Sequence, residues 1–199
     1  MPLALATLAG DLQAVTATLR ASTVAVETGR HGIGSGIAWD DARTFVTNAH
    51  VARGTRVALR AGDGRRIAGE VVARDEGRDL ALVVADAPLD GVRAIVAAPP
   101  AAIVPGALVF ALGHPLGIPD AVTAGVLHGL GPAPGFLPLP PAVRARRWLA
   151  ADVHLAPGNS GGPLADATGR VLGLNTMIVG GIALAVPIAD VARFVRAAA

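Results

Sequence analysis

The feature that most restricts the fold is a serine flanked by glycines, Gly158-Asn159-Ser160-Gly161-Gly162-Pro163-Leu164, late in a chain whose five histidines all precede it. A serine without bulky neighbours can be reached by a carbonyl group and by backbone N–H donors together, as nucleophilic catalysis requires. Serine is scarce here, because only Ser22 and Ser35 accompany it. The segment is a candidate nucleophile site, and the alternative interpretation is a glycine-rich turn.

Several folds activate a serine with a histidine and a carboxylate, and they differ in the order of these three residues along the chain. The segment also fits the G-x-S-x-G nucleophile elbow of α/β-hydrolases, in which the histidine follows the serine. No histidine follows Ser160, which excludes that fold. A subtilisin-like order, with Asp40 or Asp41 first, disagrees with the strand-rich pattern of the chain. The order His, Asp, Ser remains.

Short β-favouring segments separated by Gly, Asp and Arg dominate the sequence after a helical pattern over residues 5–21. The spacing of the first six predicts a closed barrel. The predicted strands cover residues 23–27, 33–39, 44–47, 56–59, 67–73 and 80–84, then 107–112, 121–130, 147–153, 171–176 and 182–186.

Proline and glycine mark the breaks in this pattern. The Pro/Ala-rich residues 98–105 predict a connector between two units. Residues 131–141 predict a long surface loop, because proline does not fit inside a sheet. Pro187 is placed in the first turn of a C-terminal helix, whose apolar residues from Ile188 to Val195 have helical spacing.

Composition excludes several classes of protein. Hydrophobic residues make up 52% and charged residues 16%, which excludes a disordered chain. Without cysteine there is no disulfide and no thiolate metal site, and neither a metal nor a cofactor is expected. The basic stretch from Arg53 to Arg66 contains no aromatic residue, so we expect a solvated face and no nucleic acid partner. The N-terminus lacks the basic region of a signal peptide, and no segment suits a membrane span, so the default expectation is a cytoplasmic protein without a membrane partner, with a periplasmic or secreted location left open.

His50 and Asp79 are the best candidates to activate Ser160. His50 follows an apolar strand in Thr47-Asn48-Ala49-His50-Val51, and Asp79 precedes one in Arg78-Asp79-Leu80-Ala81-Leu82. Strand ends hold side chains rigidly at the edge of a cleft. Alone, His50 could be an ordinary strand-end residue and Asp79 a turn former, but their combination with Ser160 weakens both alternatives.

Five blocks of sequence resemble the protease domain of the HtrA (Deg) serine proteases, within the chymotrypsin-like class. Their order and spacing agree from about residue 24 to the C-terminal helix. The blocks are Thr47-Asn48-Ala49-His50-Val51, Asp79-Leu80-Ala81-Leu82, Ala111-Leu112-Gly113-His114-Pro115-Leu116-Gly117, Pro157 to Leu164, and Gly173-Leu174-Asn175-Thr176 through Ala185-Val186-Pro187.

The resemblance implies an all-β, chymotrypsin-like fold of two six-stranded barrels with short terminal helices. It divides the chain into a helical segment (1–22), a first barrel with His50 and Asp79 (23–97), a connector (98–105), a second barrel with Ser160 (106–187) and a helix (188–199). It implies a trypsin-like serine endopeptidase with a His50, Asp79 and Ser160 triad. The backbone N–H groups of Gly158 and Ser160 would form its oxyanion hole.

Substrate recognition is also inferred from the resemblance. Leu155, Ile178 and Ile182 would surround an aliphatic pocket for small or medium apolar side chains, and the backbone of Asn175, Thr176 and Met177 would pair with the substrate. His154 is a departure, since the family usually has a small residue there; pointing inward, it would admit acidic side chains. His114 replaces a common asparagine and receives no catalytic role. Since the sequence stops after the protease module, no PDZ domain is expected. The family commonly forms trimers through an aromatic-rich N-terminal segment; residues 1–23 contain no aromatic residue, which argues against a trimer and leaves the oligomeric state open.

Three functions are compatible with these residues. The leading hypothesis is an endopeptidase that cleaves unfolded or extended protein segments through an acyl-enzyme, with a role in protein quality control. A peptide-binding or chaperone-like module with an inactive triad is the second. An esterase is the third, and it would not need a strand-pairing groove.

Overall fold

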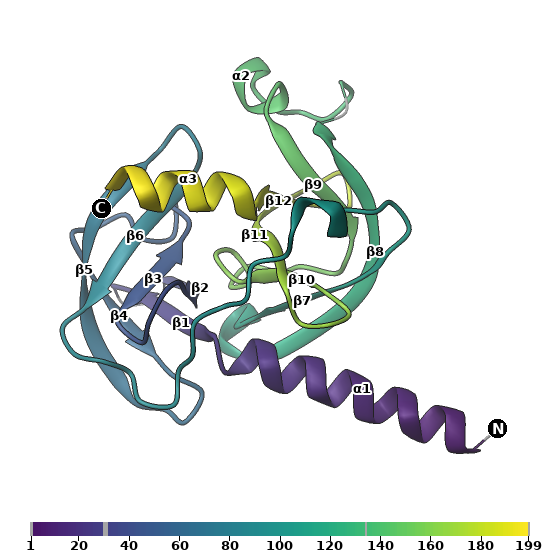
Figure 1. Cartoon of the computed structure of the whole chain (residues 1–199). Helices are drawn as coiled ribbons and strands as arrows, with labels where there is room; N and C mark the ends of the chain where they lie inside the picture. The colour runs from purple at the N-terminus through teal and green to yellow at the C-terminus, as the bar shows by residue number, and fades with distance from the viewer. Residues whose placement is uncertain (1, 30–31, 134, 199) are drawn as a thin grey trace.

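The computed structural model describes residues 2–29, 32–133 and 135–198, and His31 lies outside this part. Two closed antiparallel barrels lie side by side (Figure 1). The first closes in the order β1-β2-β3-β6-β5-β4, with β1 (Thr23–Thr28), β2 (Gly32–Ala38), β3 (Thr44–Thr47), β4 (Arg56–Arg60), β5 (Arg66–Asp75) and β6 (Leu80–Ala85). The second closes in the order β10-β11-β12-β9-β8-β7, with β7 (Leu108–Gly113), β8 (Ala121–Pro132), β9 (Arg147–Asp152), β10 (Pro163–Asp166), β11 (Val171–Val179) and β12 (Ile182–Pro187). The predicted double six-stranded barrel is confirmed.

Three helices and two 3-10 turns complete the described part of the chain. Helix α1 (Pro2–Arg20) extends away from the barrels, and α3 (Ile188–Ala198) runs from the end of β12 across the first barrel (Figure 1). The remaining elements are η1 (Pro100–Ala102), η2 (Pro115–Gly117) and α2 (Pro141–Arg144).

Alternation along the strands explains how both faces of a strand are buried. In β6, Leu80 and Leu82 face the seam between the barrels, while Ala81 and Val83 fill the first barrel. On the other side of the seam, the cluster includes residues of β11 and β12 and the Val191 side chain of α3. Successive side chains in a strand point to opposite faces, so a strand buried on both faces needs a continuous apolar run. The seam fixes how the two barrels sit around the site.

Helix α1 packs its buried side chains on the second barrel. Its buried Val15 and Leu19 pack against Phe110 and Leu112 of β7 and Ala165 of β10. The helix is longer than the sequence predicted, with 19 residues. Its last residues therefore lie beside β10, the strand that follows the nucleophile segment.

Proline was the main source of error in the predicted boundaries. Strand β10 was missed, because Pro163 stands at its first residue, where a missing N–H is tolerated. Pro132 ends β8, opposite Arg147, so the strand extends into the predicted loop. Pro187 ends β12, opposite Gly173, and the C-terminal helix begins one residue later.

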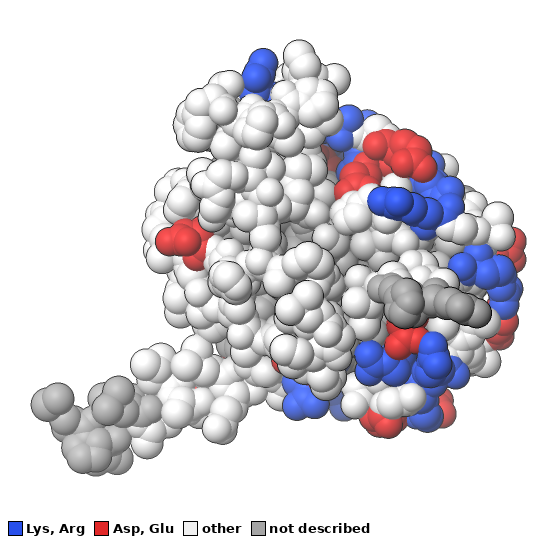
Figure 2. Space-filling view, turned by 180° about the vertical axis from the view of Figure 1, so that it is seen from behind, with Lys and Arg blue, Asp and Glu red and all other residues white. Residues whose placement is uncertain are grey.

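Charged side chains gather on the first barrel, on the right of Figure 2, where blue and red atoms lie close together. Several are ion-paired, as Arg60 is with Glu27 at 2.8 Å and Arg78 with Asp75 at 2.6 Å. The second barrel is mostly uncharged in this view. No helix of the described chain is both long and apolar enough to cross a membrane.

Candidate active site

His50 and Asp79 are brought together because the strands beside them are neighbours. β3 and β6 pair with Thr47 opposite Ala81, so the turn after β3 meets the residue before β6. The Asp79 carboxylate binds His50 twice, through Oδ2 to the ring Nδ1 at 2.7 Å and through Oδ1 to the backbone N–H at 2.9 Å. An ionised carboxylate only accepts hydrogen bonds, so Nδ1 carries a proton and Nε2 of the neutral ring is left as an acceptor.

Asp79 is held in an uncommon backbone conformation. Its φ is +57°, in the left-handed region, which Asp tolerates better than most residues. The Asn48 amide donates to the Asp79 carbonyl at 2.9 Å and to Thr176 Oγ1 of the second barrel at 3.1 Å. Asn48 therefore ties the backbone of Asp79 to the second barrel, while the His50 side chain stays 41% exposed and open to a ligand.

Ser160 lies in the loop between β9 and β10, and both barrels hold this loop by hydrogen bonds to its backbone. The Ser160 carbonyl accepts from the Ser35 N–H of β2 at 2.8 Å, and the Gly161 N–H donates to the Asn175 carbonyl at 2.8 Å. Gly161 has φ of +86°, and a Cβ there would lie 2.0 Å from the Ser35 carbonyl oxygen. Only glycine fits, which explains this part of the motif.

The residues before Ser160 are clamped through their carbonyl groups. The Pro157 carbonyl accepts from the Leu116 N–H at 2.9 Å, and the Gly158 carbonyl accepts from the Ser35 hydroxyl at 2.8 Å. Gly158 has φ of +111°, and a Cβ would lie 2.2 Å from the His114 carbonyl oxygen. Within the described chain, the N–H groups of Gly158 and Ser160 have no partner. Such paired free donors can bind an anionic oxygen.

A cavity of about 410 Å³ joins the sequence-predicted residues of both barrels. Seven of its lining residues were predicted, namely His50, Leu155, Gly158, Ser160, Thr176, Met177 and Ile178. Four were not, namely Ile33, Ala156, Pro157 and Asn159. Three of these four adjoin the serine in sequence, a signal that could have found them, whereas Ile33 comes from β2 and no local pattern points to it.

Three predicted substrate residues lie outside this lining. His154 is exposed, and its carbonyl accepts from the Thr123 hydroxyl at 2.9 Å. Asn175 is buried, with its N–H bound to Gly162 and its carbonyl to Gly161. Ile182 of β12 packs on the seam cluster. The backbone of Asn175 is thus already used by the nucleophile loop.

The edge of β11 offers free backbone groups beside the cavity. β10 pairs with β11 only as far as Leu174, whereas β12 pairs with Met177, Ile178 and Val179. One edge of residues 177–179 therefore has no neighbouring strand in the described structure, and an extended chain can add there.

The Ser160 hydroxyl itself donates to the Thr176 carbonyl at 3.1 Å. Among the described residues, no hydrogen bond joins it to His50. Catalytic hydrogen bonds are often long or misaligned in ligand-free structures and tighten when the substrate binds.

The chain belongs to the trypsin-like peptidase domain family, whose model matches residues 34–174. Its relatives are HtrA/Deg proteases. One is the chloroplastic Protease Do-like 1 of Arabidopsis thaliana, 37% identical over 154 residues, which cover 74% of this chain and 33% of that protein. Another is a periplasmic DegP-like serine endoprotease of Halomonas elongata, 31% identical over 173 residues, or 82% of this chain and 34% of that protein.

Solved structures agree on the fold. An HtrA-type protease, AlgW, solved with a tripeptide, superposes with a TM-score of 0.82 at 24% identity, covering 93% of this chain and 62% of that one. The chain spans about a third of the length of the curated relatives named above. These relatives are named for the chloroplast and the periplasm, which leaves the location of this chain open and does not support the cytoplasmic default.

Proposed function

We propose that this protein is a serine endopeptidase that cleaves unfolded or extended protein segments through an acyl-enzyme. The observation that carries the proposal is the His50–Asp79 pair at 2.7 Å, whose histidine lines a cavity together with Ser160. Membership of a serine protease family supports the same reaction class.

Each residue then has a role that follows from its contacts. Ser160 Oγ attacks the substrate carbonyl after a rotation from Thr176 toward His50 Nε2, which takes its proton and later gives it to the leaving amine. Asp79 fixes the ring and its tautomer. The free N–H groups of Gly158 and Ser160 stabilise the oxyanion, and each such donor contributes about 2.7 to 4 kcal/mol to transition-state stabilisation in comparable enzymes.

The lining of the cavity supports a preference for small or medium aliphatic side chains before the scissile bond. Ile33, Leu155, Met177 and Ile178 supply an apolar wall. The free edge of β11 would hold the substrate as an added strand, which requires an extended or unfolded segment. His154, being exposed, adds no acidic preference in this arrangement.

The test is covalent labelling by a fluorophosphonate together with casein cleavage. The wild type should be labelled at Ser160 and should cleave casein, and Ser160→Ala should do neither. His50→Ala should lose both activities, whereas the matched control His128→Ala, at an exposed histidine outside the cavity, should keep them. Absence of labelling in a folded wild-type preparation, beside a labelled control protease, would contradict the proposal.

A second candidate is a peptide-binding or chaperone-like module with a latent triad. The Ser160 hydroxyl bonded to Thr176, rather than to His50, favours it. Equal peptide binding by wild type and Ser160→Ala, with cleavage by neither, would support this module and contradict the endopeptidase.

A further inference from the structure

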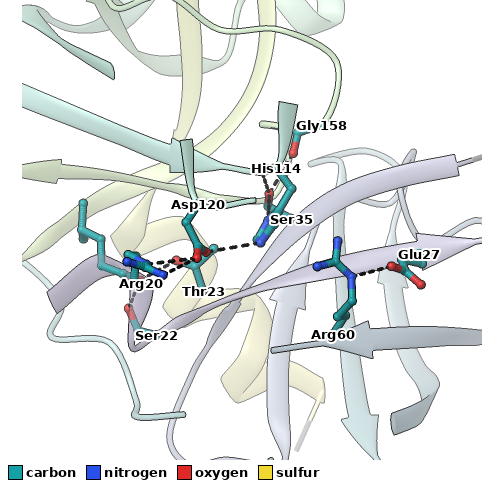
Figure 3. Close-up of polar contacts among 10 residues, drawn as sticks. Arg20, Ser22, Thr23, Glu27, Ser35, Arg60, His114, Asp120 and Gly158 are labelled. Carbon is teal, nitrogen blue, oxygen red and sulfur yellow. Dashed lines mark hydrogen bonds and ion pairs between the residues drawn. The ribbon is translucent and has the colours of Figure 1, made fainter. Parts of the chain in front are cut away.

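A second histidine lies directly behind the nucleophile loop, and it is fully buried. His114 comes at the end of β7, with 0% of its surface exposed. Its Nδ1 lies 3.1 Å from the Ser35 hydroxyl, and its Nε2 lies 3.5 Å from Asp120 Oδ1 (Figure 3). Both Nε2 and Asp120 Oδ1 are buried without a hydrogen bond in the described chain.

Ser35 connects this histidine to the candidate oxyanion hole. Its hydroxyl donates to the Gly158 carbonyl at 2.8 Å and accepts from the His114 backbone N–H at 3.1 Å (Figure 3). The same backbone N–H also reaches the Gly158 carbonyl, at 3.3 Å. The Ser35 contact is the shorter of the two that orient Gly158.

Counting protons shows that a neutral His114 cannot satisfy all of these contacts. The Ser35 hydroxyl has one hydrogen, which goes either to the Gly158 carbonyl or to an unprotonated Nδ1. With its single proton on Nε2, the ring donates to Asp120 and draws the Ser35 hydrogen away from Gly158. With that proton on Nδ1, the Gly158 contact is kept, but the Nε2 lone pair faces the carboxylate.

The doubly protonated ring satisfies every contact at once. Nδ1–H then donates to Ser35 Oγ, the Ser35 hydroxyl donates to Gly158, and Nε2–H donates to Asp120. In the neutral ring, the carboxylate attracts the single proton more strongly than a hydroxyl does, because hydrogen bonds to an ionised acceptor are stronger. Neutral His114 therefore favours the tautomer with its proton on Nε2. In this tautomer the Ser35 hydroxyl turns to Nδ1, and the Gly158 carbonyl loses that hydrogen bond.

We propose that Ser35 and His114 are positioning residues of the oxyanion hole, and that a second proton on His114 tightens it by returning the Ser35 hydroxyl to the Gly158 carbonyl. The inference rests on the proposed function for its kinetic consequence only. The hydrogen-bond relay itself does not depend on catalysis.

Burial and the charged groups around His114 determine the pH range in which it takes up the second proton. Burial lowers the pKa of His114, the nearby charges of Asp120 and Glu27 act in the opposite direction, and Arg60 adds to the lowering. Arg20, at the end of α1, is ion-paired with Asp120 at 2.9 Å, and Arg60 is paired with Glu27 (Figure 3). The second proton therefore binds on the acid side of the ordinary histidine range.

The kinetic test compares kcat across pH in wild type and His114→Asn. An asparagine amide can donate to Ser35 at any pH, and the ionisation of His50 is common to both proteins. The ratio of wild-type to variant kcat should rise by about two- to tenfold as the pH falls from 8 to 5, the effect of one net hydrogen bond. The control His128→Asn, at an exposed histidine, should give a flat ratio.

Ser35→Ala supplies the second arm. It should lower kcat more than it raises KM, and in its background His114→Asn should cause no further pH-dependent change. A flat ratio for His114→Asn, or a Ser35→Ala effect confined to KM, would overturn the proposal.

NMR on the full chain carrying Ser160→Ala keeps the test independent of activity. The Asn159 amide belongs to the peptide whose carbonyl is that of Gly158, so its ¹⁵N shift should titrate with the His114 ring nitrogens. If this titration is seen in a protein whose wild type cleaves nothing, the relay stands and the endopeptidase proposal fails. If the wild type cleaves and the two signals do not titrate together, the relay is wrong.

Discussion

Among the described residues there are two His–Asp pairs, one in each barrel, and they differ in distance, burial and hydrogen bonding. His50 and Asp79 are 2.7 Å apart, and the histidine is 41% exposed. His114 and Asp120 are 3.5 Å apart, both nearly buried, and the facing atoms have no hydrogen bond. The first carboxylate also binds a backbone N–H of its histidine, which fixes one tautomer. The His50 ring is thus accessible to a ligand, whereas the facing atoms of His114 and Asp120 leave room for a proton between two buried groups.

The largest expected difference between the pairs is in catalysis. Asp79→Asn should lower kcat/KM on the order of 10⁴-fold, because an amide can donate to Nδ1 and so stabilise the wrong His50 tautomer. Asp120→Asn, the matched change in the other pair, should lower kcat/KM by about tenfold or less. Steady-state kinetics on one peptide substrate would measure both, and similar losses in the two variants would contradict a direct catalytic role for the first pair alone.

The pH dependence of stability should separate the pairs by a smaller amount. Because the pKa of His114 is lowered in the folded state, the unfolded chain takes up the proton first as the pH falls below about 6.5. The free energy of unfolding then falls by at most about 1.4 kcal/mol per pH unit, until the folded protein is protonated too.

Urea unfolding at pH 7 and pH 5 would measure this loss in wild type and in His114→Asn. The variant should lose less stability between the two pH values, since its asparagine does not titrate. A larger loss in the variant than in the wild type would contradict the lowered pKa.

The smallest effect should come from the ion pair that joins α1 to the buried pair. Arg20→Gln removes a partner of Asp120, whose side chain is only 8% exposed. It should lower the free energy of unfolding by only about 1 kcal/mol, because Arg20 itself is half-exposed and solvent weakens the pair. Arg56→Gln is the control, since Arg56 and Asp86 are both about half-exposed, and it should lower the free energy of unfolding by less than Arg20→Gln does. Chemical denaturation would compare them; equal costs would mean that the burial of Asp120 adds nothing to its pair.

The sequence predicted the barrels well because strand alternation and turn residues are local signals. It failed at Pro163, Pro132 and Pro187, where proline stands at a strand end and local rules place it in a loop or a helix. In the cavity, Leu155, Met177 and Ile178 were found, whereas Ile33 was missed and His154 lies outside the lining. Whether a strand-end side chain points inward depends on the neighbouring barrel.

The sequence by itself indicated the family and the two-barrel fold, because five motif blocks, among them those of His50, Asp79 and Ser160, agree in order and spacing with the HtrA protease domain. Only the tertiary structure placed His114 beside Ser35 and Asp120, on which its proposed positioning role depends. Its contact with Ser35 joins residues 79 positions apart, and the contact of Arg20 with Asp120 spans 100. The chemistry of such groups depends on burial and on which polar atoms face each other, and the packing of one barrel against the other decides both.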